Sequence, residues 1–328
     1  MRQLVLHNTN VCNLQCKHCF RDFDKNCNID TTLLSSVLPD AIKIGYDSVV
    51  FTGGEPCMHP EFKKQFDIIV EHGMGVSIVS NGFNLDGYKF IADYKKHINF
   101  VAFSLDGSTA STHDTQRNKD GVFDSVLESA KWMVEQGISV RFTMCISKIN
   151  QHQIEDVYAL AKSVGVNDMI YISVISCNHG SGKTNSDLLL SNAEKDGCVS
   201  RINKMYYSGI KPNIIYTASL NDNASASERP LVEFCSSLNL DYSPAITINP
   251  SGEVVMCCDL VHNGISVGSL KNNTFIDLYY KVGDMQDRLK KLRRKMIASG
   301  EYVGFAGFNS CEFCNTYITK EEKENKEV

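Results

Sequence analysis

The sequence predicts an α/β protein: βα units with a parallel sheet, either open or curled toward a barrel, followed by a small α+β domain with one hairpin and one helix. Two observations support the parallel sheet. Short β-branched apolar segments alternate with helix-period segments over about the first 175 residues, and a glycine follows each of four predicted helices. A third observation supports the second domain, because the alternation stops near residue 220 and a hairpin pattern replaces it.

Each element of the βα units is predicted from its periodicity. The predicted strands are Gln3–Asn8, Ser48–Phe51, Val76–Ser80, Phe100–Ser104, Val140–Ser147 and Met169–Val174. The predicted helices between them are Thr32–Ile44, Pro60–His72, Phe123–Gln136 and Gln151–Ser163. The glycines that follow these helices are Gly45, Gly73, Gly137 and Gly165, each where a left-handed residue ends a helix.

The second half contains fewer regular elements. A Gly- and Ser-rich loop, Ser176–Asn185, precedes a predicted helix over Ser191–Tyr207. A hairpin is predicted from Ala245–Asn249 and Glu253–Cys257, and a long helix over Thr274–Lys295. The expected domains are residues 1–220, 221–319 and a charged tail over 320–328.

Composition excludes several classes of protein. Lys and Arg number 33 against 38 Asp and Glu, a net charge of −5, which gives no electrostatic reason to expect nucleic acid or an anionic membrane as partner. The sequence has no apolar run of about 18 residues and no signal-peptide pattern, so we expect a cytoplasmic protein. Thirteen cysteines in a reducing compartment indicate metal binding or catalysis rather than disulfides.

Three cysteines follow the first predicted strand: Cys12, Cys16 and Cys19, spaced four and three residues apart. Zinc sites and ordinary iron–sulfur sites usually use four protein ligands, so three thiolates would leave one iron of a cluster with an open position. With Cys27 as fourth ligand the site would instead be closed and structural, for example a zinc site. Both alternatives stay open on spacing alone.

Further motifs follow in order at the ends of later strands. They are Thr52-Gly53-Gly54-Glu55-Pro56, Ser80-Asn81-Gly82, Ser104-Leu105-Asp106-Gly107 and Asn150. Together with Cys-x3-Cys-x2-Cys and the aromatic-type His18 before its last cysteine, this ordered set resembles the radical S-adenosylmethionine (radical SAM) family. Taken alone, the Gly-Gly-Glu-Pro motif is also compatible with a simple tight turn and the Ser-x-Asp-Gly motif with a type I turn.

The resemblance implies a partial (β/α)6 barrel of the TIM type, and it also implies the chemistry of the site. Cys12, Cys16 and Cys19 would hold a [4Fe-4S] cluster whose fourth iron binds the amino and carboxylate groups of SAM. Reductive cleavage of SAM would then give a 5′-deoxyadenosyl radical that abstracts a substrate hydrogen. Residues expected to bind the cofactor are His18, Gly53, Gly54, Glu55, Pro56, Ser80, Asn81, Ser104, Asp106 and Asn150. Among them, Gly53 to Glu55 suit the ammonium group of SAM, and Asn81, Ser104 and Asp106 suit its ribose.

Four cysteines in the last third form a second candidate site: Cys235, Cys257, Cys311 and Cys314, with Cys258 as the alternative to Cys257. The Cys311-x2-Cys314 pair is a strong ligand signature. The region resembles the twitch domain, a short form of the SPASM domain, which implies one auxiliary [4Fe-4S] cluster. A zinc knuckle is the rival interpretation.

Other residues are candidates for the substrate chemistry. Cys177 and His179 lie in one polar loop and could act as hydrogen donor or base, although a solvated loop histidine is also common. Cys57 and Cys145 lie at strand ends, where core packing is the alternative. The basic segment from Arg288 to Lys295 is typical of a solvated amphipathic helix and could also meet an electron donor such as flavodoxin or ferredoxin.

The sequence therefore predicts a radical SAM enzyme that modifies a ribosomally made peptide by epimerisation or crosslinking. The first alternative is dehydrogenation of a small molecule such as an aminocyclitol or sugar alcohol. A remoter alternative is an iron–sulfur or zinc protein that senses redox state without catalysis. The oligomeric state stays unknown.

Overall fold

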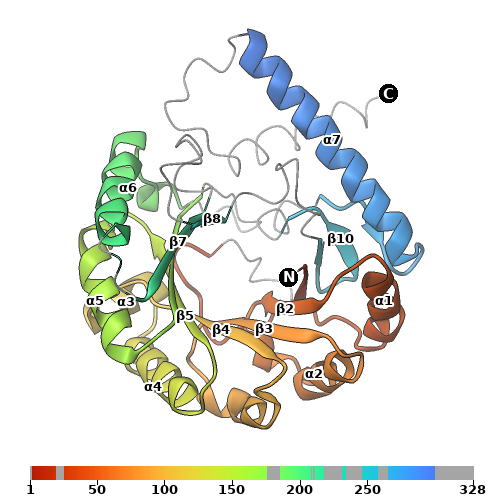
Figure 1. Cartoon of the computed structure of the whole chain (residues 1–328), viewed down its shortest axis with the longest axis horizontal. Helices are drawn as coiled ribbons and strands as arrows, with labels where there is room; N and C mark the ends of the chain where they lie inside the picture. Colours follow the sequence, from red (N-terminus) through yellow and green to blue (C-terminus); the bar gives the residue numbers. More distant parts are fainter. Residues whose placement is uncertain are drawn as a thin grey trace.

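The computed structural model describes residues 2–19, 26–175, 185–207, 209, 211–217, 231–233, 246–257 and 265–299. These residues form an eleven-stranded sheet in the order β11-β10-β9-β1-β2-β3-β4-β5-β6-β7-β8. Neighbours from β1 to β8 are parallel. The sheet curves, with most helices on its outer side, so the α/β fold with a partial barrel is confirmed (Figure 1).

The parallel strands are β1 (Gln3–Thr9), β2 (Ser48–Gly53), β3 (Gly75–Ser80), β4 (Ile98–Ser104), β5 (Val140–Ile146), β6 (Asp168–Ser173), β7 (Asn213–Thr217) and β8 (Leu231–Glu233). The helices beside them are α1 (Thr32–Lys43), α2 (Phe62–Glu71), α3 (Ala110–Arg117), α4 (Val122–Glu135), α5 (Ile154–Val164) and α6 (Asn192–Tyr206). Short 3-10 helices are η1 (Pro56–Met58), η2 (Leu85–Tyr94), η3 (Gln151–Gln153) and η4 (Ser186–Leu188).

The six predicted strands and the predicted helices are confirmed with shifts of a few residues at their ends. Gly45, Gly73, Gly137 and Gly165 all have φ between +74° and +91°, as the helix ends require. The sequence reading missed α3, η2, β7 and β8. The two extra strands continue the parallel sheet beyond the six that were predicted.

The hydrophobic core lies between the sheet and the helices. Strand residues alternate between its two faces, because successive side chains of a strand point in opposite directions. In β5, Val140, Phe142 and Met144 are fully buried in this core, whereas Arg141 and Thr143 between them are only half-buried. The inner face of the barrel is therefore the more accessible one.

The predicted hairpin is present as β9 (Thr247–Ile248) and β10 (Glu253–Val255), followed by β11 (Gly268–Ser269). Strand β9 pairs in parallel with β1, so the hairpin extends the barrel sheet. The long helix α7 (Phe275–Ser299) packs against α1, and Arg2 of the barrel donates to the Tyr279 hydroxyl at 2.8 Å. The domain boundary near residue 220 stays a prediction.

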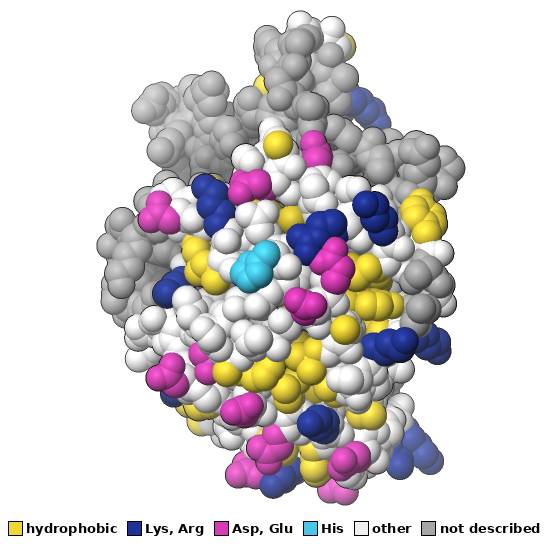
Figure 2. All heavy atoms as spheres, turned by 90° about the vertical axis from the view of Figure 1, so that its left-hand side faces the viewer, with side chains coloured by type: hydrophobic (Ala, Val, Ile, Leu, Met, Phe, Trp, Pro, Cys, Tyr) yellow, Lys and Arg dark blue, Asp and Glu magenta, His cyan; other side chains and the backbone are white. Residues whose placement is uncertain are grey.

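The surface carries mixed charge. On the face of the molecule shown in Figure 2, acidic and basic side chains are interspersed around small apolar areas. Among the helices that the structure describes, none has the length and apolarity that a membrane crossing requires.

Candidate functional site

The loop that carries Cys12, Cys16 and Cys19 follows β1 and is tied to two neighbouring elements. Backbone hydrogen bonds run from the residues after β2 to the end of β1 and to this loop, from Gly54 N to Thr9 O at 2.7 Å and from Glu55 N to Val11 O at 2.8 Å. On the other side, Lys17 N donates to Gln116 O of α3 at 3.0 Å. The cysteine loop is therefore held from both sides at the carboxyl end of the sheet.

The two glycines of the Gly-Gly-Glu-Pro motif are required by this contact. A Cβ on Gly53, whose φ is +131°, would lie 2.5 Å from Thr9 O. A Cβ on Gly54 would lie 2.1 Å from Val11 O. The sequence reading attributed the glycines to close approach of a ligand, and the structure adds a close approach of the chain's own cysteine loop.

Two side-chain N–H groups face sulfur atoms of this loop. Asn81 Nδ2 lies 3.6 Å from Cys12 Sγ and also donates to Asn13 Oδ1 at 2.7 Å. Arg117 Nη1 lies 3.7 Å from Cys16 Sγ. Such donors stabilise thiolate sulfur, as the ligands of an iron–sulfur cluster require.

Asp106 is fully buried and forms the centre of a network next to the loop. Its Oδ2 atom lies 2.7 Å from Arg117 Nε, and its Oδ1 atom accepts from Cys145 N at 2.8 Å. Burial alone would raise the pKa of Asp106, but the nearby Arg117 guanidinium holds it below its usual value. The carboxylate is thus ionised and pairs with the guanidinium.

Two histidines border this ion pair, and both are neutral at pH 7. His18 Nε2 lies 3.9 Å from Asp106 Oδ2, and burial lowers the pKa of His18 to about 4. Burial also lowers the pKa of His113 to about 3, and its Nδ1 atom accepts from Asp106 N at 3.0 Å. The buried Nδ1 atom of His18 has no hydrogen-bond partner in the described part of the chain, so it is free to meet a ligand.

Glu55 is also fully buried, and both of its oxygens accept hydrogen bonds from the chain. Ser80 Oγ donates to Oε1 at 2.9 Å, Asn81 N donates to Oε2 at 2.8 Å, and the Tyr88 hydroxyl donates to Oε1 as well. Burial raises the pKa of Glu55, although these three hydrogen bonds oppose the shift. In this structure the side chain joins the ends of β2 and β3.

The other predicted cofactor residues lie near these groups. Asn150 is buried, and its Nδ2 atom donates to the carbonyl oxygens of Asp106 at 2.8 Å and Cys145 at 2.9 Å. Pro56 O accepts from Asn8 Nδ2 at 3.1 Å. Ser104 ends β4 and is half-buried. The predicted residues therefore gather at one edge of the sheet, and several of them position the loops of that edge.

Cys27 would be the fourth ligand of the structural zinc site, but its thiol contacts a different segment of the chain. It donates to Pro250 O at 3.4 Å, in the turn between β9 and β10. Within the described ranges, no group of three His, Cys, Asp or Glu side chains is arranged around a single metal ion, with Cys27 or without it.

Of the auxiliary-cluster residues, only Cys257 belongs to the described part of the chain, where it is half-buried after β10. The remaining predicted residues lie outside the described residues: Cys177, His179, Cys235, Cys258, Cys311 and Cys314. Cys145 packs with Val174 and Leu188 in a small apolar cluster, the alternative that sequence reasoning had left open for it.

Sequence reasoning missed three functional neighbours, His113, Gln116 and Arg117, because it missed α3. A signal was available. Thr109 caps the helix by accepting from Thr112 N, and positions 113, 116 and 117 share one helical face by their spacing.

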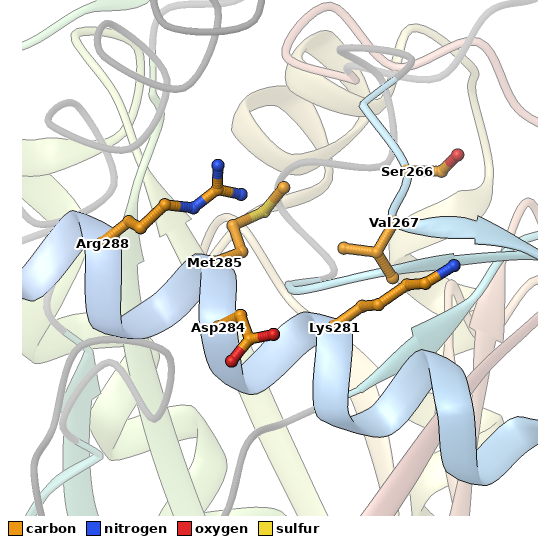
Figure 3. Close-up of a pocket in the computed structure, with 6 residues that line it drawn as sticks. All are labelled: Ser266, Val267, Lys281, Asp284, Met285 and Arg288. Atoms are coloured by element: carbon orange, nitrogen blue, oxygen red, sulfur yellow. The ribbon is translucent and has the colours of Figure 1, made fainter.

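A separate hollow of about 500 Å³ lies between α7 and the segment before β11 (Figure 3). Lys281, Asp284, Met285 and Arg288 line it from the helix, and Ser266 and Val267 from the opposite side. None of these residues belongs to the cysteine loop or its network, so the hollow does not define the site.

The first strand of the parallel βα sheet ends in a three-cysteine loop, and buried polar groups from the next four strand ends surround this loop. This arrangement defines a cofactor site of the iron–sulfur type. Residues 8–161 match the family model described as the radical SAM superfamily. A radical SAM domain therefore covers these residues of the chain. Such a domain implies a [4Fe-4S] cluster and S-adenosylmethionine as cofactors, and the thiols of Cys12 and Cys16 with their N–H donors fit such a cluster.

Curated relatives are about a quarter identical to the chain over the residues that align. Fe-coproporphyrin III synthase of Methanosarcina barkeri is 26% identical over 217 residues, which are 65% of this chain and 54% of that protein. The subtilosin biosynthesis protein AlbA of Bacillus subtilis is 26% identical over 168 residues, 50% of this chain and 37% of that protein. The mycofactocin maturase MftC of Mycobacterium tuberculosis is 26% identical over 160 residues, 48% of this chain and 41% of that protein. The chain spans about half the length of these relatives or less.

Solved structures share the fold. SuiB of Streptococcus suis, bound to its precursor peptide SuiA, superposes with a TM-score of 0.69 at 16% identity, over 87% of this chain and 66% of that chain. The protein anSMEcpe with bound AdoMet gives a TM-score of 0.67 at 17% identity, over 86% of this chain and 82% of that chain. At these identities the likeness concerns the fold.

Proposed function

We propose that this protein is a radical SAM enzyme that modifies a ribosomally made peptide, by epimerisation or by crosslinking. The observation that supports it most is the cysteine loop, held from both sides at the carboxyl end of the sheet with N–H donors on Cys12 and Cys16. The peptide substrate is supported by the similarity to AlbA and MftC and by the fold of SuiB, which binds a precursor peptide.

In this proposal Cys12, Cys16 and Cys19 hold the cluster, and the strand-end residues hold SAM beside it. When bound, the two cofactors supply a 5′-deoxyadenosyl radical that takes a hydrogen atom from the substrate. The chain contributes position and exclusion of water. Glu55, Asp106 and Asn150 fix the loops, while His18 Nδ1 and the half-buried Ser104 remain to contact the cofactor. Cys177 and His179 are proposed as hydrogen donor or base for the substrate.

The test is cleavage of SAM by the full-length protein, reconstituted anaerobically with iron and sulfide and reduced with dithionite. We expect 5′-deoxyadenosine from the wild type and none from Cys16→Ala, because three ligands are needed to hold the cluster. Cys198→Ala is the matched control, since Cys198 is a buried cysteine of α6 outside the site. A fully loaded wild type that forms no 5′-deoxyadenosine would refute the proposed chemistry.

The auxiliary cluster is proposed at Cys235, Cys257, Cys311 and Cys314, with Cys258 as the alternative to Cys257. Two [4Fe-4S] clusters contain about eight iron atoms per chain, and Cys311→Ala with Cys314→Ala is expected to lower the count to about four. An unchanged count would remove this part of the proposal. An electron donor such as flavodoxin or ferredoxin is proposed to supply the reducing electron in the cell.

The second candidate substrate is a small molecule. The similarity to Fe-coproporphyrin III synthase, which extends over 65% of this chain, favours a tetrapyrrole in that class. Incubation of the reconstituted protein with SAM and an iron tetrapyrrole precursor of Fe-coproporphyrin III separates the two candidates. Loss of mass from the porphyrin, with one 5′-deoxyadenosine formed per hydrogen removed, would support the tetrapyrrole and contradict the peptide.

A further inference from the structure

A guanidinium group lies between the cysteine loop and a fully buried carboxylate of the site. Arg117 is 7% exposed and Asp106 is 0% exposed. The two ends of the guanidinium have different neighbours, since Nε faces Asp106 Oδ2 at 2.7 Å and Nη1 faces Cys16 Sγ at 3.7 Å. Sequence reasoning gave no role to Arg117, and a role for Asp106 only toward the ribose.

We propose that Arg117, oriented by Asp106, raises the reduction potential of the cluster held by Cys12, Cys16 and Cys19. This inference rests on the proposed function, because it concerns the cluster of that same site. Reduction adds one electron to the cluster, taken from an external one-electron donor such as dithionite, and no covalent bond changes. A positive charge and an N–H donor at a ligand sulfur favour the reduced, more negative cluster.

The orientation of the pair decides the sign of its effect. The guanidinium stands between the carboxylate and the sulfur, so the positive end of the ion pair faces Cys16. Asp106 is fixed in turn, because its Oδ1 atom accepts from Cys145 N of β5 at 2.8 Å. The charge at Asp106 partly offsets that of Arg117, but it is separated from the sulfur by the guanidinium itself.

The two histidines beside the pair contact its acidic residue. His18 Nε2 lies 3.9 Å from Asp106 Oδ2, and His113 Nδ1 accepts from Asp106 N at 3.0 Å. In the described part of the chain, the Arg117 guanidinium lies 3.7 Å from the sulfur of the proposed cluster ligand Cys16. Its burial matters because a charge interacts more strongly at low dielectric than in water.

The chain offers a matched control at the opposite end of the barrel. Arg141 at the start of β5 pairs with Asp168 at the start of β6, with Arg141 Nε 2.8 Å from Asp168 Oδ2. This pair has the same chemistry as Arg117 with Asp106, but it lies near the amino ends of the strands. If a change in midpoint potential came from a general loss of stability, both Arg117→Gln and Arg141→Gln would show it. A local electrostatic effect on the cluster would appear in Arg117→Gln alone.

The experiment is a potentiometric titration of the reconstituted full-length protein, followed by the EPR signal of the reduced cluster, without SAM. Arg117→Gln is expected to make reduction about tenfold less favourable, which lowers the midpoint by ~59 mV for one electron. Arg117→Lys keeps the charge and is expected to stay nearer the wild type. Arg141→Gln is expected to leave the midpoint unchanged.

Asp106→Asn provides a test of sign that does not depend on Arg117→Gln holding its cluster. It keeps the shape of the side chain but removes the offsetting charge, so its midpoint is expected to rise above that of the wild type. The inference is overturned if the midpoint potential of Asp106→Asn is equal to or below that of the wild type. It is also overturned if a cluster-loaded Arg117→Gln keeps the wild-type midpoint, or if Arg141→Gln shifts the midpoint as much as Arg117→Gln does. If the wild type itself binds no cluster, the proposed function fails, whereas a wild type that cleaves SAM with unshifted variants refutes only this inference.

Discussion

Gly54→Ala is the substitution for which the structure predicts the largest local effect. The new Cβ would lie 2.1 Å from Val11 O, 2.7 Å from Val11 C and 2.9 Å from Asn10 C. All three are backbone atoms, so no side-chain rotation relieves the overlap. Real Cβ atoms stay at least 3.0 Å from such atoms, so the end of β2 or the cysteine loop must move by about 0.9 Å (3.0 − 2.1). We expect a loss of about 3 kcal/mol in the free energy of unfolding, at the upper end for overpacking.

Two other glycines serve as controls for this substitution. Gly73→Ala places its Cβ in open space but keeps a φ of +74°, so it tests backbone strain alone and is expected to cost about 1–2 kcal/mol. Gly197→Ala lies within α6, with nothing near its Cβ and no positive φ, and is expected to stabilise the protein by up to about 1 kcal/mol.

The assay has two parts, because the overlap acts on the loop that carries the cluster ligands. Urea unfolding of the three variants measures stability, and iron analysis after reconstitution measures the cluster. Gly54→Ala is expected to lose the first cluster, about four iron atoms per chain, while both controls keep it. A Gly54→Ala protein with wild-type stability and full iron would refute the steric reasoning.

Further predictions concern buried polar groups. Tyr88→Phe removes the hydroxyl that donates to Glu55 and is expected to lower the free energy of unfolding by about 1–2 kcal/mol in urea. Tyr94→Phe is the control, because its partner carboxylate is partly exposed, and an equal loss there would contradict the role of burial. Burial lowers the pKa of His7 to about 4 and that of His113 to about 3, whereas a histidine in the unfolded chain has a pKa of about 6.5. Below about pH 6.5 the unfolded chain therefore binds more protons than the folded protein does. Stability is therefore expected to fall as the pH falls from about 6.5 toward 4, by roughly 2 kcal/mol per histidine at pH 5, and urea midpoints that do not change between pH 7.5 and pH 5 would contradict this.

The sequence predicts the fold well wherever an apolar pattern repeats. The six strands and most helices of the barrel bury apolar side chains at regular spacing, so their periodicity is visible without a structure. Helix α3 was missed for a physical reason, since its buried residues are polar: His113, Asp114, Gln116 and Arg117. A hydrophobic pattern cannot reveal a helix whose buried face is held by hydrogen bonds and an ion pair.

The candidate site is predictable as a set of residues but not as a set of contacts. The cysteine spacing and the strand-end motifs identify Glu55, Asp106 and Asn150 from local sequence. Their partners are distant in the chain, as with Tyr88 for Glu55, and no local pattern links them. The geometry therefore shows these side chains holding loops together, where residue type alone suggested direct contact with the cofactor.

The two faces of the barrel strands indicate where a substrate would lie. Outer-face side chains such as Phe51, Ile78 and Phe103 are fully buried against the helices. On the inner face, near the carboxyl ends of the strands, the corresponding side chains are only half-buried: Thr52, Val79, Ser104, Thr143 and Ile172. These half-buried side chains lie at the same edge as the cysteine loop, where βα barrels usually bind their ligands. All five are uncharged and small or branched, so a ligand that contacts them would meet a neutral surface.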